Sequence, residues 1–460
     1  MKLLYYLFVF SIFSFPIYAA DIHVPADYTT IQEAIDAANN GDTVIVENGI
    51  YYENINLLGK EIILTSNFHF TGDVNDIINT IINGSQPVDS DFGSCVTFTN
   101  GENQNTILKG FTLTEGSGTK TYNPAEDLFF RTGGGILINN SSPTITNNII
   151  RDNVCTAETG VFGAGGGGIR MGFGQPLIKN NIIKDNTGGY AGGIMIAYCG
   201  GSTLKNNLIA RNTATGSFNG GGGVYVDWES ITLENNTIVN NHSGDRGGGM
   251  ISTGTSTVVV NCIFYGNTAT NGSPQIYKRF TNGNAEVTYS NIEGGFDGMG
   301  NEEGLIDVDP IFDNVSNFLL DASSPCIDAG NPDSQYYDIE NPASPGNALF
   351  PAQGLLLNDM GANGGQGSES FLSVSESILA TGVEFLYKNP YQNEGITLQS
   401  NRSGHFEINL FSYDGKKLSE TIQIDVNEGI TQIPLTINHS CIVHIVESNG
   451  TSTVLKLIKL

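Results

Sequence analysis

The sequence predicts an all-β protein whose central part is a parallel β-helix, a solenoid in which short strands stack coil upon coil. Two observations support this prediction. A glycine-rich run followed by a seven-residue block bounded by asparagine occurs five times between Gly133 and Asn267, with blocks starting at 147, 180, 206, 235 and 261. Each copy contains two short apolar runs rich in Ile and Val, which are too short for helices. Steps of 26 to 33 residues between blocks are typical of stacked repeats, in which no single repeat buries its apolar face alone.

The residue types within each copy predict where the corners and the core lie. Asparagine tolerates the left-handed backbone of sharp corners, so the first and last asparagines of each block are expected to stack into ladders of bonded amides. Ile182, Ile209 and Ile238 are expected to line the solenoid axis. The residue after each glycine run is expected to point inward. One outward column should then contain Leu137, Arg170, Met195, Tyr225 and Ile251, with Asn139, Gly172, Ala197, Asp227 and Thr253 two residues further on.

The chain begins with features of export and of a capped solenoid. Residues 1–20 are predicted to be a secretory signal peptide, because Lys2 precedes an apolar core and a small-residue end; an N-terminal anchor is the alternative. Residues 22–65 are expected to form a cap. Thr30-Ile31-Gln32-Glu33 reads as a capping box that starts a helix ended by Gly41, and 44–46 and 62–64 are expected to be the first strands. A helix laid over the first coil would cover its exposed strand edge.

The segments Tyr28–Ile35, Gly41–Val44 and Gly49–Ile55, taken with the repeats, resemble the start of pectin-lyase-like right-handed β-helix proteins. The resemblance covers residues 22 to about 320 and implies a right-handed parallel β-helix. It does not specify an activity, because that fold carries lyases, hydrolases, tailspikes and adhesins. The domain expected here is a β-helix over 21–365, with glycine and asparagine coils over 105–300.

Residues 303–365, called the closing segment below, resemble the signature that ends many bacterial surface β-helix proteins, through Asp307–Phe312, Leu319–Gly330 and Asn358–Ala362. The segment is rich in aspartate, whose carboxylates either cap turns and face water or supply oxygen ligands to Ca²⁺. The candidate calcium ligands are Asp328, Asp333, Asp338 and Asp359. No EF-hand spacing is present, and calcium is the only cofactor that the sequence suggests.

After a linker at 366–382, residues 383–460 alternate apolar and polar residues and predict a small β-sandwich. This module resembles the type A C-terminal sorting domain of the type IX secretion pathway, through Lys388-Asn389-Pro390, Asp414-Gly415-Lys416 and the terminal Leu455–Leu460. The resemblance implies recognition by the type IX secretion machinery and a location outside the cell or on its surface. A sandwich that binds a ligand is the alternative.

Charged and aromatic residues gather on or beside the outward column named above. The candidate carbohydrate-binding residues are Arg170, Tyr190, Phe218, Tyr225, Asp227, Trp228, Asp245 and Arg246, because aromatic rings stack on sugars and the charges could act on an acidic one. Solvated decoration of the coils is the plainer interpretation. No paired carboxylates are found in the arrangements of polygalacturonases, so the sequence favours binding over catalysis, with a polysaccharide lyase or hydrolase as the alternative.

The composition of the chain restricts the kinds of molecule that it can bind. The formal charge of −27 predicts repulsion from nucleic acid and from anionic membranes. This negative charge also argues against binding of a polyanionic polysaccharide, unless Ca²⁺ bridges the protein and the polysaccharide. No stretch beyond the leader has the roughly 18 to 20 apolar residues that a membrane span needs. The six cysteines lack the spacing of a metal site or a disulfide scaffold and are expected to be small buried side chains.

Overall fold

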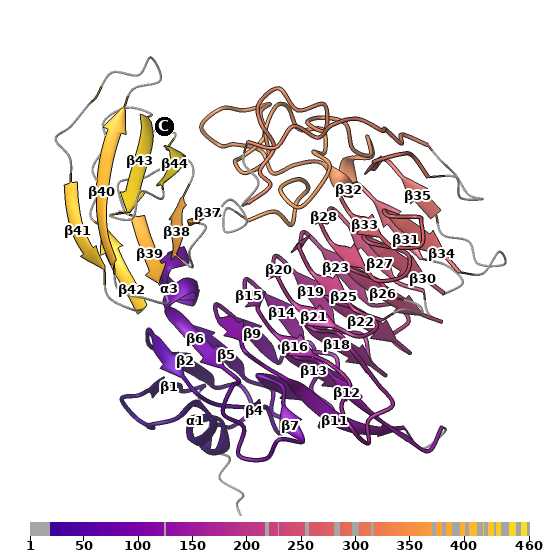
Figure 1. Ribbon diagram of the computed structural model, residues 1–460, viewed down its shortest axis with the longest axis vertical. Helices are drawn as coiled ribbons and strands as arrows, with labels where there is room; N and C mark the ends of the chain where they lie inside the picture. Colours follow the sequence, from indigo (N-terminus) through magenta and orange to yellow (C-terminus); the bar gives the residue numbers. More distant parts are fainter. Residues whose placement is uncertain are drawn as a thin grey trace, which may run out of the picture.

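The computed structural model describes residues 19–123, 126–216, 220–228, 230–253, 257–279, 286–296, 303–313 and 317–369, together with the strands between 374 and 457. Residues 1–18 of the expected signal peptide lie outside this set. The predicted parallel β-helix is confirmed. Three long parallel sheets run the length of the stack, and each coil contributes one strand to each sheet (Figure 1).

The strands of the solenoid belong to four parallel sheets. Sheet A contains β1 (Asp21–Val24), β2 (Thr43–Val46), β5 (Ile63–Ser66), β9 (Ile107–Lys109), β14 (Thr144–Thr146), β19 (Leu177–Lys179), β23 (Thr203–Lys205), β27 (Thr232–Glu234), β31 (Val258–Val260) and β35 (Glu286–Thr288). Sheet B contains β3 (Gly49–Tyr51), β6 (Thr80–Asn83), β10 (Thr112–Thr114), β15 (Ile149–Arg151), β20 (Ile182–Lys184), β24 (Leu208–Ala210), β28 (Thr237–Val239), β32 (Ile263–Tyr265) and β36 (Asn291–Ile292). Sheet C contains β4 (Ile55–Asn56), β8 (Val96–Phe98), β13 (Ile136–Asn139), β18 (Ile169–Gly172), β22 (Ile194–Ala197), β26 (Val224–Asp227), β30 (Met250–Ser252) and β34 (Ile276–Lys278). The short sheet E contains β16 (Val154–Cys155), β21 (Thr187–Gly188), β25 (Thr213–Ala214), β29 (His242–Ser243) and β33 (Thr268–Ala269).

Two buried ladders of asparagine side chains connect the coils. In the ladder at the last block position, Asn186 Nδ2 donates to Asn212 Oδ1 at 3.0 Å, and Asn212 Nδ2 donates to Asn241 Oδ1 at 3.0 Å. The predicted ladder at this position is confirmed. The second ladder is formed by the second residue of each block, as in the 3.1 Å bond from Asn181 Nδ2 to Asn207 Oδ1.

The prediction that the first asparagine of each block forms a bonded ladder is wrong. These residues are Asn147, Asn180, Asn206, Asn235 and Asn261, and all have a left-handed backbone with φ between 50° and 56°. This backbone turns the corner between sheets A and B and directs the amides away from the core. The second residue of each block then takes the inward place. Only the longer 3.4 Å bond from Asn261 Nδ2 to Asn235 Oδ1 joins two of the outer amides.

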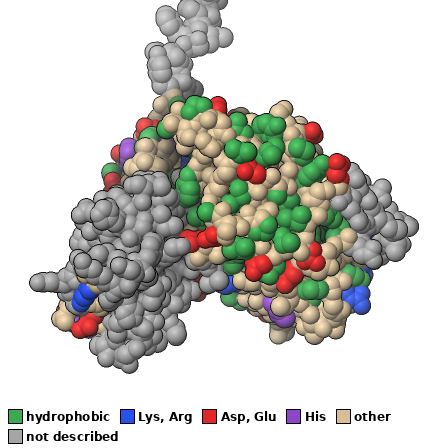
Figure 2. Space-filling model, turned by 90° about the horizontal axis from the view of Figure 1, so that it is seen from above, with side chains coloured by type: hydrophobic (Ala, Val, Ile, Leu, Met, Phe, Trp, Pro, Cys, Tyr) green, Lys and Arg blue, Asp and Glu red, His purple; other side chains and the backbone are tan. Residues whose placement is uncertain are grey.

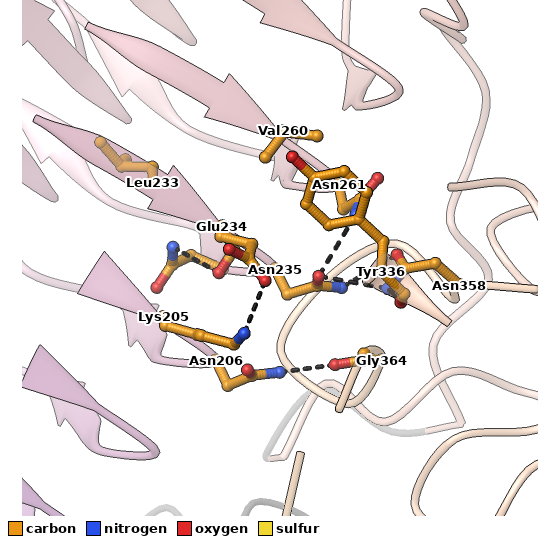
Figure 3. A network of polar contacts seen from close by, with 12 residues as sticks. Lys205, Asn206, Leu233, Glu234, Asn235, Val260, Asn261, Tyr336, Asn358 and Gly364 are labelled. Carbon is orange, nitrogen blue, oxygen red and sulfur yellow. Dashed lines mark hydrogen bonds and ion pairs between the residues drawn. The ribbon is translucent and has the colours of Figure 1, made fainter. Parts of the chain in front are cut away.

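The outer amides bind the closing segment instead (Figure 3). Asn206 Nδ2 donates to the carbonyls of Ala362 at 2.9 Å and Gly364 at 2.6 Å. Asn235 Nδ2 donates to the carbonyl of Asp359 at 2.8 Å. The closing segment therefore folds back along the corner between sheets A and B rather than only ending the stack.

From β6 to β32, sheet B is largely buried on both of its faces. Ile183, Ile209 and Ile238 pair along one column and lie in the solenoid core, all with no exposed surface. Ile182 pairs with Leu208 and lies on the other face, in a second apolar cluster with Phe318, Leu320 and Met360. The expectation for Ile209 and Ile238 is confirmed, whereas Ile182 is buried beneath the closing segment and not on the axis. The sequence could not distinguish the two faces, because a strand that is covered on both sides has apolar residues on both. Ile182 and its neighbour Ile183 are therefore equally apolar although they point in opposite directions.

The N-terminal cap is larger than the sequence predicts. Helix α1 (Ile31–Ala37) begins as expected, with the Thr30 side chain accepting a bond from the Glu33 amide at 3.2 Å, although Glu33 turns to the Thr29 hydroxyl rather than back to Thr30. The first strand is β1, not 44–46, and it forms the edge of sheet A. Two further helices, α2 (Phe68–Thr71) and α3 (Val74–Asn79), were not predicted and cover the start of sheet B.

Beside sheet C, segments of three coils form an additional small sheet. Strands β7 (Phe92–Gly93), β11 (Gly118–Asn123), β12 (Leu128–Thr132) and β17 (Gly163–Gly165) form sheet D, in which β11 and β12 pair antiparallel. This small sheet precedes the glycine runs that enter sheet C.

Towards the C-terminus, the strands form two four-stranded antiparallel sheets. One contains β37 (Val374–Leu379), β38 (Val383–Lys388), β39 (Ile396–Ser400) and β42 (Gly429–Ile433). The other contains β40 (Gly404–Phe411), β41 (Ile422–Val426), β43 (Cys441–Glu447) and β44 (Ser452–Leu457). The Asn389-Pro390 and Asp414–Lys416 pieces of the sorting-domain resemblance lie outside the described residues.

Five cysteines, at 95, 155, 199, 262 and 326, are buried thiols, which confirms for these five the prediction of small buried side chains. Burial raises the pKa of the Cys262 thiol to about 12, so this residue is a neutral side chain in the inner ladder, where Asn236 donates to its sulfur at 3.3 Å.

Helix η1 (Ser334–Tyr336) is a single turn in the closing segment. Within the described ranges no helix is long and apolar enough to cross a bilayer.

Candidate saccharide-binding surface

The outward column predicted for sheet C is present. Arg170, Met195, Tyr225, Ile251 and Tyr277 are successive partners on β18, β22, β26, β30 and β34. Alternation along each strand sends the flanking Ile and Val residues into the core and leaves this column on the outer face. Parallel pairing in register therefore places residues from five separate coils side by side.

Three of the predicted residues form one electrostatic group on this face. Asp227 accepts a bond from the Thr253 hydroxyl at 2.8 Å and a longer one from the Tyr225 hydroxyl at 3.5 Å. Burial raises the pKa of Asp227, and the nearby charges of Arg170 and Arg279 oppose that rise. Burial, followed by the charge of Asp227, raises the pKa of Tyr225.

Arg170 is the cation of this group. Burial lowers the pKa of Arg170, and the charge of Asp227 opposes that effect. The Nη1 atom is buried and has no hydrogen-bond partner in the described part of the chain. It lies over Gly172, where an added methyl group would be 3.2 Å from Nη1. A buried N–H group without a partner costs free energy, and this atom is closed off from solvent in the structure.

A row of aromatic rings follows the same strands. Phe173, Tyr198 and Trp228 come directly after β18, β22 and β26, one in each coil, and are 54%, 50% and 56% exposed. The Phe173 and Tyr198 rings are stacked, with centroids 4.9 Å apart and planes 7° from parallel. All three residues have a left-handed backbone, with φ of 53°, 58° and 60°. This backbone is strained for bulky residues, and such strain is concentrated at functional sites.

The remaining predicted residues lie on the opposite side of the column. The Tyr190 ring faces that of Tyr225, with centroids 6.4 Å apart. Arg246 does not join the Arg170 group; it donates to the Tyr277 hydroxyl at 2.6 Å and lies over the Tyr277 ring. Asp245 accepts a bond from Asn271 and is also apart from the group. Phe218 lies outside the described residues.

Phe173 and Tyr198 were not among the predicted residues, although the sequence contained a signal for them. Each directly follows a residue of the second outward column, Gly172 or Ala197, at the place where Asp227 precedes Trp228. Extending the predicted columns by one residue would have aligned all three rings. Arg279 and Tyr277 were missed because the glycine run before β34 is absent.

Three of the four candidate calcium ligands lie close together in the closing segment. Asp338 and Asp359 are 4% and 1% exposed, and their oxygens accept backbone N–H groups, including those of Gln353 and Asp328 at 2.7 and 2.8 Å. Burial raises the pKa of both, and for Asp359 the charge of Asp338 adds to it. Asp328 accepts the Leu355 amide, and Asp333 is exposed apart from them. Among the described residues no three acidic, His or Cys side chains are grouped to hold a metal ion. The backbone bonds to Asp338 and Asp359 are those of turn-capping carboxylates, and calcium binding stays a prediction.

The family model described as "Right handed beta helix region" matches residues 132–282, which contain the five repeats and most of sheet C. Together with the sheet topology, this match supports a right-handed parallel β-helix repeat protein. No curated protein matches the chain.

Proposed function

We propose that this chain is a secreted or cell-surface protein that binds a saccharide along the outer face of sheet C. The observation that carries the proposal is the exposed row of Phe173, Tyr198 and Trp228 on three successive coils. Flat exposed rings offer apolar faces to sugar rings, whereas a soluble protein normally buries residues of this size. A repeated spacing of about 4.8 Å between coils suits an extended, repeating ligand better than a compact one.

The polar group beside the rings supplies direction and specificity. Asp227 can accept sugar hydroxyls, and the nearby positive charge of Arg170 favours an acidic or hydroxyl-rich ligand. A few polar groups beside apolar rings are the usual composition of a small-molecule site.

The test is binding of the purified full chain to a panel of glycans, followed by single substitutions on the best ligand. Tyr198→Ala and Trp228→Ala should each weaken binding roughly 5- to 30-fold, the equivalent of about 1–2 kcal/mol. Tyr52→Ala is the matched control, because Tyr52 is 51% exposed but lies in the N-terminal cap. Equal binding by all three variants, or binding to no glycan at all, would remove the proposal.

Export through the type IX pathway, by way of residues 383–460, is part of the same proposal. It rests on the terminal sequence resemblance, and a signal peptide at 1–20 would deliver the chain to the periplasm first. A surface location places a saccharide-binding face where polysaccharides are found.

A polysaccharide lyase is the second candidate, favoured by the cation Arg170 with its lowered pKa beside Asp227 and Tyr225. Such an enzyme removes a proton next to a sugar carboxylate, for which a base and a neutralising cation are needed. Incubation with acidic polysaccharides should then give an unsaturated product that absorbs ultraviolet light, and Arg170→Met should abolish it. If no product forms with any acidic polysaccharide, only binding remains.

A further inference from the structure

A separate hollow lies on the outer face of sheet A, over strands β5, β9, β14 and β19. Its volume is about 200 Å³. It is lined by Ile63, His69, Ile107, Lys109, Thr144, Thr146, Asn147, Lys179 and Glu369. A second hollow of about 390 Å³ shares Ile63 and Ile107 and continues towards Glu61 and Gln104. None of these residues belongs to the sheet C surface.

Basic residues are concentrated along this face. The chain has 20 Lys and Arg residues against 47 Asp and Glu, and in Figure 2 few basic side chains are visible among the acidic ones. Lys109, Lys179 and Lys205 nevertheless share one outward column, with Thr146 between the first two. Because neighbouring strands are about 4.8 Å apart, Lys109 and Lys179 stand roughly 10 Å apart on either side of Thr146.

The three lysines differ in their partners. Lys205 forms an ion pair with Glu234 at 2.6 Å and does not line the hollow. The Lys109 ammonium lies over the Phe68 ring, 5.3 Å from its centroid. Lys179 has no ion pair among the described residues. Two lysines therefore face one hollow, and among the described residues no carboxylate forms an ion pair with either of them.

One carboxylate does reach the rim, and its own bonds are satisfied elsewhere. Glu369 accepts Asn147 Nδ2 at 2.8 Å and Asn180 Nδ2 at 3.1 Å. Two further carboxylates are near: Asp21 acts electrostatically on His69, and Glu61 lines the adjoining hollow. His69 faces the same hollow, and burial followed by the charge of Lys109 lowers its pKa, so at neutral pH the ring is neutral and can donate or accept a bond.

We infer that this hollow binds the oxyanion group, a carboxylate or a sulfate, of an acidic saccharide, with Lys109 and Lys179 as its two cationic contacts. The two ammonium groups of the lining select an anion by charge complementarity, on a chain that is otherwise strongly negative. The small volume admits a single sugar unit or chain end rather than an extended polymer. Ile63 and Ile107 on the shared wall offer apolar surface to a sugar ring.

The experiment is isothermal titration calorimetry of the purified full chain with sodium glucuronate, sodium sulfate and neutral glucose, at ionic strength held constant with chloride. Saturable binding of glucuronate or of sulfate, without binding of glucose, is expected, and the two anions distinguish a carboxylate site from a sulfate site. Lys109→Met and Lys179→Met should each weaken the affinity for the bound anion roughly ten- to hundredfold, as expected for loss of a charge-assisted bond. Glu369→Gln should tighten it, because a repelling charge is removed.

Lys205→Met is the matched control, since it removes a lysine of the same column that lies outside the hollow. An equal loss in Lys205→Met and Lys179→Met would show diffuse attraction to the face and overturn the inference, as would binding of glucose or of neither anion. Tyr198→Ala should leave this binding unchanged, so failure of the sheet C proposal and failure of this one are separate results.

Discussion

The buried asparagines show how a single residue type can hold a solenoid together. Asn212 Nδ2 donates both to the Ile183 carbonyl at 2.8 Å and to the next amide in the ladder, and its oxygen accepts the Asn186 amide N–H at 3.1 Å. Every rung therefore satisfies backbone groups that the corner leaves without strand partners. A buried polar group is tolerated in a core when all of its bonds are made.

Asn212→Ala should consequently destabilise the protein by several kcal/mol, at about 1–3 kcal/mol for each buried group left unpaired. The measurement is the midpoint of chemical unfolding. Asn271→Ala, at an exposed asparagine, should change stability by no more than about 0.5 kcal/mol. Equal effects of the two substitutions would mean that the ladder contributes no stability.

Ile209→Ala removes apolar volume from the solenoid axis and should cost about 2–5 kcal/mol of unfolding free energy. Ile50→Ala serves as its control, because Ile50 is 51% exposed. The same denaturation curves test both, and an unchanged midpoint for Ile209→Ala would contradict the observed register.

At the scale of elements, the closing segment makes sheet B an interior sheet. Phe318, Leu320, Cys326 and Met360 cover its outer face, and the outer asparagines bind the backbone of residues 359–364. In its described residues the segment has isolated bridges and one short helix, and these side-chain bonds and its buried carboxylates take the place of regular pairing. Its stability should therefore depend on the charge of those carboxylates.

The folded protein raises the pKa of Asp338 and Asp359 above the value near 4 of an unfolded aspartate. Their contribution to stability is then fully present below about pH 4 and is lost as pH rises through the raised values. The free energy of unfolding, measured from pH 4 to pH 9, should fall less steeply in Asp359→Asn than in the wild type. Asp333→Asn, at an exposed position of the same segment, should keep the wild-type slope; a steeper slope in Asp359→Asn would contradict the assignment.

The sequence predicted the coils well because strand alternation and corner chemistry are local. Leu137, Arg170 and Tyr225 fall in one outward column as expected, since parallel strands in register preserve the repeat. The return of the closing segment depends on contacts such as Asn147 with Glu369, which are 222 residues apart, and no local pattern encodes them. The predictions for Ile182 and for the first asparagine of each block were wrong for the same reason, because both residues contact the closing segment. The aromatic row could have been found, because its spacing is that of the repeat.

On the scale of the whole molecule, two surfaces with opposite character share one stack. Sheet C carries the aromatic row, and sheet A carries the lysine column, because each coil contributes one strand to each sheet. A solenoid can add or alter a surface by changing one column without disturbing the core. The strands from 374 onward form sheets separate from these.

Deletion of residues 383–460 tests the proposed export role. The truncated chain should remain folded, with a thermal unfolding midpoint close to that of the full chain, because none of the solenoid sheets includes a strand from this region. Cell fractionation should find it retained in the periplasm. Normal arrival at the surface, or failure of the purified fragment to fold, would instead make the module structural.

The bonds of Asn147 and Asn180 to Glu369 also decide how the molecule responds to tension. A force applied to the chain beyond Glu369 enters at the coils of β14 and β19, not at the last coil. It first loads these two contacts, and then those of Asn206 and Asn235 with residues 358–364, before it reaches the last coil. A protein tethered through its C-terminus and pulled by a bound polymer would thus be loaded first within the stack, away from its last coil.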